Sequence, residues 1–393
     1  MQYKQFQDIR LSALGFGTMR LPTRADGTID EEKVLQMTKF AMDHGVNYFD
    51  TAYPYHGGES ERVMGRVLKA YPRDSFYLAT KYPGHQILSD GYYPEVIFEE
   101  QLEKCGVDYF DFYLLHNVNE KSIETYLDPR WGIIPYLKEQ KRLGRIKHLG
   151  FSSHAEMPTL KRFLDLYGQD MEFCQIQLNY LDWTLQDAKS KSQLLADLNI
   201  PVWVMEPVRG GSLATLSDEN TAKLRALRPR ESTAAWGFRF LETIPGVTMV
   251  LSGMSNMAQM EENVATFSGG EPLSGQEVQL LLDIAEGLKK SVPCTGCRYC
   301  CDGCPQGLDI PGLIRVYNEL RYHPHVNAAI RVEFLPEDKK PTACLACGAC
   351  TQICPQNIDI PGAMKDLARM LSELPSWAET CRQREEAAKR AKG

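Results

Sequence analysis

One cysteine pattern occurs twice in the last quarter of the chain. Each copy has four cysteines spaced C-x2-C-x2-C-x3-C, followed directly by proline. This is the spacing with which bacterial-type two-cluster proteins bind iron–sulfur clusters through thiolates. Residues beyond the cysteines recur in register as well, which indicates an internal duplication. The first copy contains Cys294, Cys297, Cys300, Cys304 and Pro305, and the second contains Cys344, Cys347, Cys350, Cys354 and Pro355.

Two other uses of these cysteines are less consistent with the pattern. Zinc sites usually combine two C-x2-C pairs or add histidines, and neither copy needs a histidine. Disulfide frameworks are typical of small secreted domains, whereas this chain has 393 residues and its start, MQYKQFQDIR, lacks the apolar core of a signal peptide. We therefore predict two [4Fe-4S] clusters and a reducing, cytoplasmic location.

Length and composition predict two unequal domains. A chain of 393 residues exceeds one ordinary hydrophobic core, and the cysteine pattern is confined to its end. We expect a larger domain at residues 1–285 and a smaller one at residues 286–393 that ends in a helical tail. The net charge of -7 argues against nucleic-acid binding, and no run reaches the ~20 apolar residues of a membrane span.

Before the cysteines, short apolar runs alternate with longer stretches of helical periodicity. Eight successive strand–helix units predict a (β/α)8 TIM barrel, followed by a small, mainly α-helical iron–sulfur domain. A doubly wound open sheet is the alternative, but no predicted strand precedes a G-x-G-x-x-G motif. The predicted strands are 11–17, 47–50, 76–81, 110–116, 147–152, 173–178, 202–205 and 247–251. The predicted helices are 31–44, 59–71, 94–104, 135–143, 158–167, 190–198, 233–241 and 257–267.

Four polar residues stand at or just after the ends of predicted strands. Asp50, Lys81 and His116 end three successive strands, and Tyr55 lies in the loop after Asp50. Barrel enzymes carry their chemistry at this end of the strands. Each residue alone has a structural explanation, such as a buried ion pair between Asp50 and Lys81. Together they supply a proton donor and groups that tune it, which is what carbonyl reduction requires.

Several motifs in this region resemble the aldo-keto reductase family in order and spacing. They are LGFGTM at 14–19, FDTAYPY at 49–55, ESE at 59–61, TK at 80–81, LLH at 114–116 and LGFSS at 149–153. The resemblance implies an oxidoreductase that reduces an aldehyde or ketone, or oxidises the alcohol, with NAD or NADP as cofactor. It also implies that Asp50, Tyr55, Lys81 and His116 are the catalytic residues.

The implied mechanism gives each of these residues a role. Tyr55 protonates the carbonyl oxygen while hydride reaches the carbon, and His116 orients the substrate. Lys81, held by Asp50, favours the phenolate and pulls the pKa of Tyr55 from about 10 toward the working pH.

The resemblance implies cofactor contacts as well, with some departures. Ser152, Ser153 and Gln175 stand where the family binds the nicotinamide carboxamide, although Ser153 replaces an asparagine. Met205 stands where an aromatic ring often stacks on the nicotinamide. The full set of expected contacts is Gly17, Thr18, Met19, Asp50, Ser152, Ser153, Gln175, Met205, Pro207, Arg209, Gly210, Ser252, Gly253, Met254, Gln259, Glu262 and Asn263.

The loop after the last predicted strand departs from the family in charge. Gly253, Met254 and Gln259 stand where many members have the basic residues that bind a 2'-phosphate. Without those cations the preference for NADP weakens. The sequence therefore favours NAD(H) slightly and leaves NADP open.

The cysteine region resembles the α-helical ferredoxin domains of iron–sulfur subunits. Its two copies are separated by a long interval with a predicted helix at 311–321, whereas compact β-rich ferredoxins have a shorter interval. The resemblance implies that the two copies exchange their fourth ligand. One cluster is then bound by Cys294, Cys297, Cys300 and Cys354, and the other by Cys344, Cys347, Cys350 and Cys304.

Three interpretations of this combination stay open, because nicotinamide transfers two electrons as hydride and each cluster transfers one. The chain is a carbonyl reductase whose clusters serve structure or docking, or an enzyme that exchanges electrons with an external ferredoxin or flavoprotein. The third interpretation is a non-catalytic nicotinamide-binding redox sensor or electron-transfer subunit, which does not explain the complete catalytic set. Aromatic residues in loops 82–93 and 118–131 indicate an apolar or ring-containing substrate; they are Tyr92, Tyr93, Tyr126 and Trp131.

Overall fold

The computed structural model consists of two compact units, which we describe separately. The first contains Met1–Thr215 and Leu224–Leu281, and the second contains Leu216–Lys223 and Leu282–Gly393. The predicted boundary at residues 285 and 286 falls inside α12 (Gly275–Leu288), whose last turns belong to the second unit. The structure describes residues 1–84, 93–120, 122–289, 292, 294, 299–322, 326–354, 358–376, 379 and 382.

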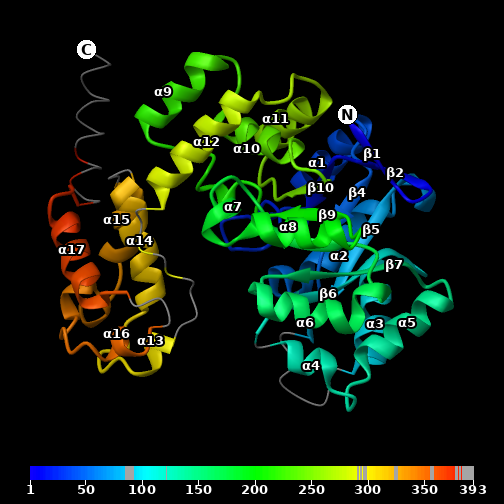
Figure 1. Ribbon diagram of the computed structural model, residues 1–393, viewed down its shortest axis with the longest axis horizontal. Coiled ribbons are helices and arrows are strands. Elements are labelled where there is room, and N and C mark those ends of the chain that lie inside the picture. Colours follow the sequence, from blue (N-terminus) through cyan, green and yellow to red (C-terminus); the bar gives the residue numbers. More distant parts are fainter. Residues whose placement is uncertain are drawn as a thin grey trace. The chain divides into compact units, whose positions relative to one another are not determined.

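Within the described residues, eight strands of the first unit form a closed barrel of parallel neighbours (Figure 1). The strands of a parallel barrel are buried on both faces, so they occur in the sequence as short apolar runs. The predicted (β/α)8 barrel is confirmed. In chain order its strands are β3 (Leu14–Gly17), β4 (Tyr48–Asp50), β5 (Tyr77–Tyr82), β6 (Phe110–Val118), β7 (Ile146–Ser153), β8 (Cys174–Gln177), β9 (Val202–Met205) and β10 (Val247–Ser252).

The predicted helices are present, and side chains mark several of their starts. Asp30 accepts a hydrogen bond from the Lys33 amide at the start of α1, and Asn256 accepts one from the Gln259 amide at the start of α11. The helices between the strands are α1 (Glu31–Asp43), α2 (Glu59–Leu68), α3 (Pro94–Cys105), α5 (Ile133–Arg142), α6 (Met157–Tyr167), α8 (Ala188–Asp197), α10 (Thr233–Glu242) and α11 (Met257–Ser268). Four further helices were not predicted: α4 (Ile123–Leu127), α7 (Asp182–Leu185), α9 (Asp218–Leu227) and α12.

An antiparallel hairpin of β1 (Tyr3–Phe6) and β2 (Ile9–Ser12) packs against the end of the barrel where the strands begin. Phe6 is buried there among aromatic residues near the strand starts, and its ring lies edge to face with Trp203 at 5.0 Å. The prediction of one strand over 11–17 is therefore wrong, because the hairpin ends at Ser12 and β3 begins at Leu14. With this end filled by apolar rings, polar chemistry is confined to the opposite end.

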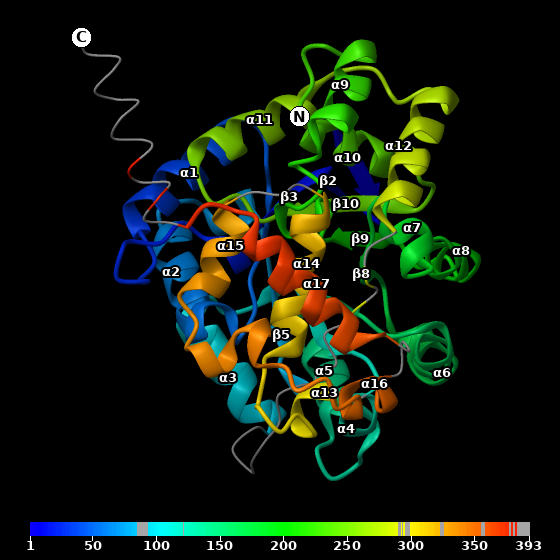
Figure 2. The ribbon, with the colours of Figure 1, turned by 90° about the vertical axis from the view of Figure 1, so that its left-hand side faces the viewer.

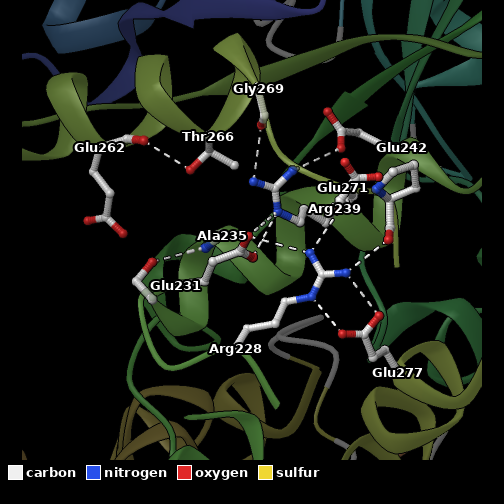
Figure 3. Close-up of polar contacts among 12 residues, drawn as sticks. Arg228, Glu231, Ala235, Arg239, Glu242, Glu262, Thr266, Gly269, Glu271 and Glu277 are labelled. Carbon is white, nitrogen blue, oxygen red and sulfur yellow. Dashed lines mark hydrogen bonds and ion pairs between the residues drawn. The ribbon is translucent and has the colours of Figure 1, made fainter. Parts of the chain in front are cut away.

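Two buried arginines connect α10 with the segment that leads into α12 (Figure 3). Arg239 pairs with Glu231 at 2.8 Å, and Arg228 binds both carboxylate oxygens of Glu277 at 2.6 and 2.9 Å. Glu277 also accepts from the Ser274 amide at 2.7 Å while its own amide donates to Ser274 Oγ, which is a capping box at the start of α12. The hydrogen bond from Arg228 lowers the pKa of Glu277 to about 2.

The second unit repeats one helical arrangement, as the duplicated sequence predicts. The longer helices of the two copies, α14 (Ile310–Tyr322) and α17 (Ile360–Ser372), pack side by side (Figure 2). Asp359 caps α17 by accepting from the Gly362 amide at 3.1 Å. The shorter helices are α13 (Tyr299–Asp302), α15 (Val326–Glu333) and α16 (Ala349–Gln352). Most of the predicted helical tail lies outside the described residues. In the described part of the chain, no helix is long and apolar enough to cross a membrane.

Candidate functional site

Four polar side chains meet at the end of the barrel where the strands finish. Asp50 ends β4, Lys81 and His116 lie near the ends of β5 and β6, and Tyr55 begins the short helix η2 (Tyr55–Gly58). Lys81 Nζ lies 2.5 Å from Asp50 Oδ1 and 3.4 Å from the Tyr55 hydroxyl. The rings of Tyr55 and His116 meet edge to face with their centroids 5.9 Å apart. The structure thus brings together all four predicted residues.

Burial controls the electrostatics of this group. Burial alone lowers the pKa of Lys81, but the Asp50 carboxylate and Tyr55 raise it above its ordinary value, so the lysine is charged. Tyr55 is partly exposed at the mouth, yet burial of its ring raises its pKa, and Lys81 offsets only part of that effect. The net shift of the Tyr55 pKa is upward, opposite to the predicted direction, because desolvation outweighs the nearby cation.

A buried polar network fixes the strand that carries Lys81. Glu61, in α2, is fully buried and accepts hydrogen bonds from Thr80 Oγ1 and Gln101 Nε2, both at 2.6 Å. Gln101, in α3, also donates to the Lys81 carbonyl at 3.1 Å. Two helices therefore hold the end of β5 through side chains that the sequence reasoning did not select.

Lys104 links this network to the loop that carries Tyr55. Its Nζ lies 2.6 Å from Glu100 Oε1, 3.8 Å from Glu61 Oε2 and 3.9 Å from the centroid of the Tyr53 ring. The Tyr53 hydroxyl donates to Glu100 Oε2 at 2.9 Å. Because Tyr53 precedes Tyr55 by two residues, one buried cation joins the tyrosine loop to the helices behind Lys81.

The residues expected to bind the carboxamide lie beside this group, on β7 and β8. Ser152 and Gln175 are paired across the two strands. Ser152 Oγ accepts from the Asn117 amide at 2.7 Å, and Ser153 Oγ donates to the Val118 carbonyl at 2.9 Å. Gln175 is buried, and its Oε1 has no hydrogen-bond partner among the described residues. A buried acceptor of this kind fits the amide N–H of a nicotinamide.

The other expected cofactor contacts lie on the loops after β3, β9 and β10. Some use their side chains within the protein: Thr18 donates to the Asp50 carbonyl at 2.9 Å, and Asn263 donates to Ser252 at 3.0 Å. Gln259 accepts from the Ser255 amide at 2.8 Å. Of the rest, Met19, Gly210, Gly253 and Glu262 are exposed, Met205 and Arg209 are partly exposed, and Gly17, Pro207 and Met254 are buried.

Two residues at this mouth were missed in the sequence. Arg20 follows Met19, and its Nη2 lies 3.4 Å from Oε1 of Glu206, which follows Met205. Glu206 has a left-handed φ of 56°, an uncommon conformation for this residue type. Direct adjacency to two expected cofactor contacts was the signal that could have identified both.

The aromatic residues of the predicted substrate loops are partly placed. Tyr126 is buried, and its hydroxyl donates to the His116 carbonyl at 2.6 Å. The rings of Tyr93 and Trp131 lie 5.4 Å apart. Tyr92 lies outside the described residues.

In the second unit, thiols from both cysteine copies line one pocket with an open volume of about 370 Å³. Cys304 of the first copy lies there with Cys344, Cys347 and Cys350 of the second. Among the described residues, no three potential ligands are grouped as a single-ion site requires. Thiols spread around a pocket suit the separate corners of a cubane cluster better than one zinc ion.

The remaining cysteines of the pattern belong to the same region. Cys300 is buried in the hydrophobic core of the second unit, and Cys294 and Cys354 pack against that core. Cys297 lies outside the described residues.

Comparison with known proteins identifies both parts of the chain. Residues 13–286 match the model of the Aldo/keto reductase family, and residues 293–358 match that of the 4Fe-4S dicluster domain. The NADH-specific methylglyoxal reductase of Escherichia coli is 25% identical over 72% of this chain and 97% of its own length. The L-galactose dehydrogenase of Arabidopsis thaliana is 27% identical over 70% of this chain and 90% of its own length.

A solved structure agrees with this result. The holo form of aldo-keto reductase AKR11C1 from Bacillus halodurans is 25% identical and superposes with a TM-score of 0.59, covering 72% of this chain and 96% of that one. The chain is therefore a member of the aldo/keto reductase family, an oxidoreductase whose barrel is followed by a 4Fe-4S dicluster domain.

Proposed function

We propose that the barrel catalyses reduction of a small aldehyde or ketone, or oxidation of the corresponding alcohol, with Tyr55 as the general acid. The observation that supports this most directly is the placement of the Tyr55 hydroxyl 3.4 Å from the buried, charged Lys81. A neighbouring cation stabilises the phenolate that remains after proton donation. Asp50 keeps that cation in position at 2.5 Å.

The residues at the mouth divide the work of this reaction. A bound nicotinamide dinucleotide supplies the hydride. Gln175 and Ser152 hold the carboxamide and so orient the ring. Tyr55 gives its proton to the carbonyl oxygen as negative charge develops there, and His116, whose ring meets that of Tyr55 edge to face, directs the substrate oxygen toward the hydroxyl.

The substrate class follows from the relatives and from the size of the reacting group. One relative is named for methylglyoxal and another for L-galactose, which share a small polar carbonyl or the alcohol derived from it. We therefore take methylglyoxal as the first probe, with NADH and NADPH compared side by side.

The test is the Tyr55→Phe variant, which removes one hydroxyl and keeps the ring. The kcat for methylglyoxal is expected to fall roughly 100- to 10,000-fold, while binding of NADH or NADPH is retained. Tyr167→Phe removes the same group from the end of α6 and serves as the control. Wild-type turnover in Tyr55→Phe would exclude Tyr55 as the acid. If the wild type reduces neither methylglyoxal nor a panel of small aldehydes, the proposed reaction itself is wrong.

For the second unit we propose two [4Fe-4S] clusters with exchanged fourth ligands. The thiols around the cysteine pocket support the set Cys304, Cys344, Cys347 and Cys350. The complementary set is Cys294, Cys297, Cys300 and Cys354. Cys347 is exposed, which favours electron exchange with a small protein partner such as a ferredoxin or flavoprotein. An anaerobic preparation is expected to contain about eight iron atoms and about eight acid-labile sulfides per chain; about half that content would leave one cluster.

A further inference from the structure

Arg20 places a positive charge between two loops at the barrel mouth. It ends the short helix η1 (Thr18–Arg20) after β3, and its carbonyl accepts from Ser255 Oγ at 2.9 Å. The stem of its side chain lies against Gly253, since a Cβ at that position would be 3.3 to 3.4 Å from three Arg20 carbons. The guanidinium reaches the other loop, where a Cβ on Gly210 would be 2.9 Å from Nη2.

These two loops follow the seventh and eighth strands of the barrel, β9 and β10. In many barrels, the loops after these strands and a nearby helix N-terminus form the phosphate-binding site. Here the helix is α11, whose first turn is capped by Asn256. Its N-terminal amides and the Arg20 guanidinium place partial and full positive charge at the same edge.

A large pocket adjoins this charge. It has an open volume of about 1020 Å³, and its lining includes Arg20, Ser255 and Asn256. Lys33, in α1, contributes a second cation to the lining and is paired with Asp30 at 3.0 Å. Ligand pockets for organic molecules commonly fall in the range of about 300 to 1,000 Å³, so this one has room for part of a nucleotide.

We propose that Arg20 binds a phosphate group of the dinucleotide cofactor, an inference that rests on the proposed use of NAD(H) or NADP(H). Gly253 stands where a basic residue is common in the family, and the Arg20 side chain lies over that glycine. A cation from the loop after β3 thus replaces the one missing from the loop after β10.

The observed partner of Arg20 is Glu206, at 3.4 Å, with both side chains partly exposed. An exposed pair of this kind is weak, whereas arginine binds phosphate through two parallel, charge-assisted hydrogen bonds. A phosphate therefore displaces Glu206 from Arg20 at little cost. Glu206 competes with the cofactor for the guanidinium, which predicts opposite effects of substitutions at the two positions.

The test measures binding rather than turnover. NADH and NADPH are titrated into the intact protein by fluorescence at several salt concentrations, for the wild type, Arg20→Met and Glu206→Gln. Arg20→Met is expected to raise Kd roughly 10- to 100-fold and to flatten its salt dependence, because one charged contact is lost. Glu206→Gln is expected to lower Kd. Arg24→Met removes the same charge from an exposed position four residues further along and controls for net charge.

The outcomes separate the possible results. Equal losses for NADH and NADPH in Arg20→Met assign the diphosphate to Arg20, and a larger loss for NADPH assigns the 2'-phosphate. If Arg20→Met binds both cofactors like Arg24→Met, the inference is overturned while the proposed reaction stands. If the wild type binds neither cofactor, the proposed function fails first and the inference fails with it.

Discussion

Replacing Lys81 with methionine tests the electrostatic basis of the proposed reaction. At the observed separation of 3.4 Å, a unit charge stabilises the Tyr55 phenolate by about 5 kcal/mol at an effective dielectric constant of about 20, or roughly 3 to 4 pKa units. Burial already raises the pKa of Tyr55, so Lys81→Met raises it further. In alcohol oxidation the phenolate is the base, and activity increases with pH through the Tyr55 pKa.

The assay is the pH profile of kcat for alcohol oxidation, recorded for wild type and Lys81→Met with the same alcohol and cofactor. The rise in activity is expected to move to higher pH by up to roughly 3 units, with a lower kcat at neutral pH. An unmoved profile in an active, folded Lys81→Met protein would refute the idea that Lys81 tunes Tyr55.

The single variant leaves Asp50 buried without its cation, which typically costs about 3 to 5 kcal/mol of stability. The double variant Asp50→Asn/Lys81→Met replaces the ion pair with neutral groups of similar size. It is expected to recover most of the lost thermal stability but not the wild-type pH profile. That difference separates a tuning role of Lys81 from a merely structural one.

Two further substitutions test the supports of the barrel. Lys104→Met, which removes the cation beside Tyr53, is expected to lower kcat more than it changes KM, because a 1 Å displacement of a catalytic group costs about 100-fold; Lys104→Arg should retain most activity, and equal losses in both variants would contradict the charge argument. Glu277 has its pKa lowered to about 2, so its contribution is present above the ordinary carboxylate pKa and is lost as pH falls toward that value. At neutral pH, Glu277→Gln is expected to reduce stability by roughly 2 kcal/mol, and its melting temperature should depend less on acid pH than that of wild type; parallel melting curves against pH would refute the assignment.

The barrel strands were predictable because each is a buried apolar run with a polar residue at its end. The segment FDFYLLH illustrates this, since six of its residues are buried in β6. The first hairpin was not predictable in the same way, because three of the four residues in β1 are exposed and only Phe6 enters the core. The start of α12 was visible as the S-x-x-E pattern of Ser274 and Glu277, although the helix was not predicted.

The candidate site was predictable in position but not in energy. Asp50, Lys81 and His116 could be located because each follows a strand, and a barrel brings strand ends together. The supports could not, because Glu61 and Lys104 come from different helices and act only through tertiary contacts. The direction of the Tyr55 pKa likewise depends on how deeply its ring is buried, which no spacing in the sequence reveals.

Hydride transfer and cluster chemistry are separable in this chain on chemical grounds. The proton donor and its supporting cation all lie within the first unit, and none of the proposed steps at Tyr55 needs a single electron. Cys304 shares a pocket with thiols of the second cysteine copy, so the proposed clusters depend on one another within the second unit. Direct exchange between the two would require nicotinamide to release its electrons one at a time, whereas it transfers them together as hydride. The clusters are therefore better matched to a one-electron protein carrier than to the nicotinamide, and carbonyl reduction does not require them.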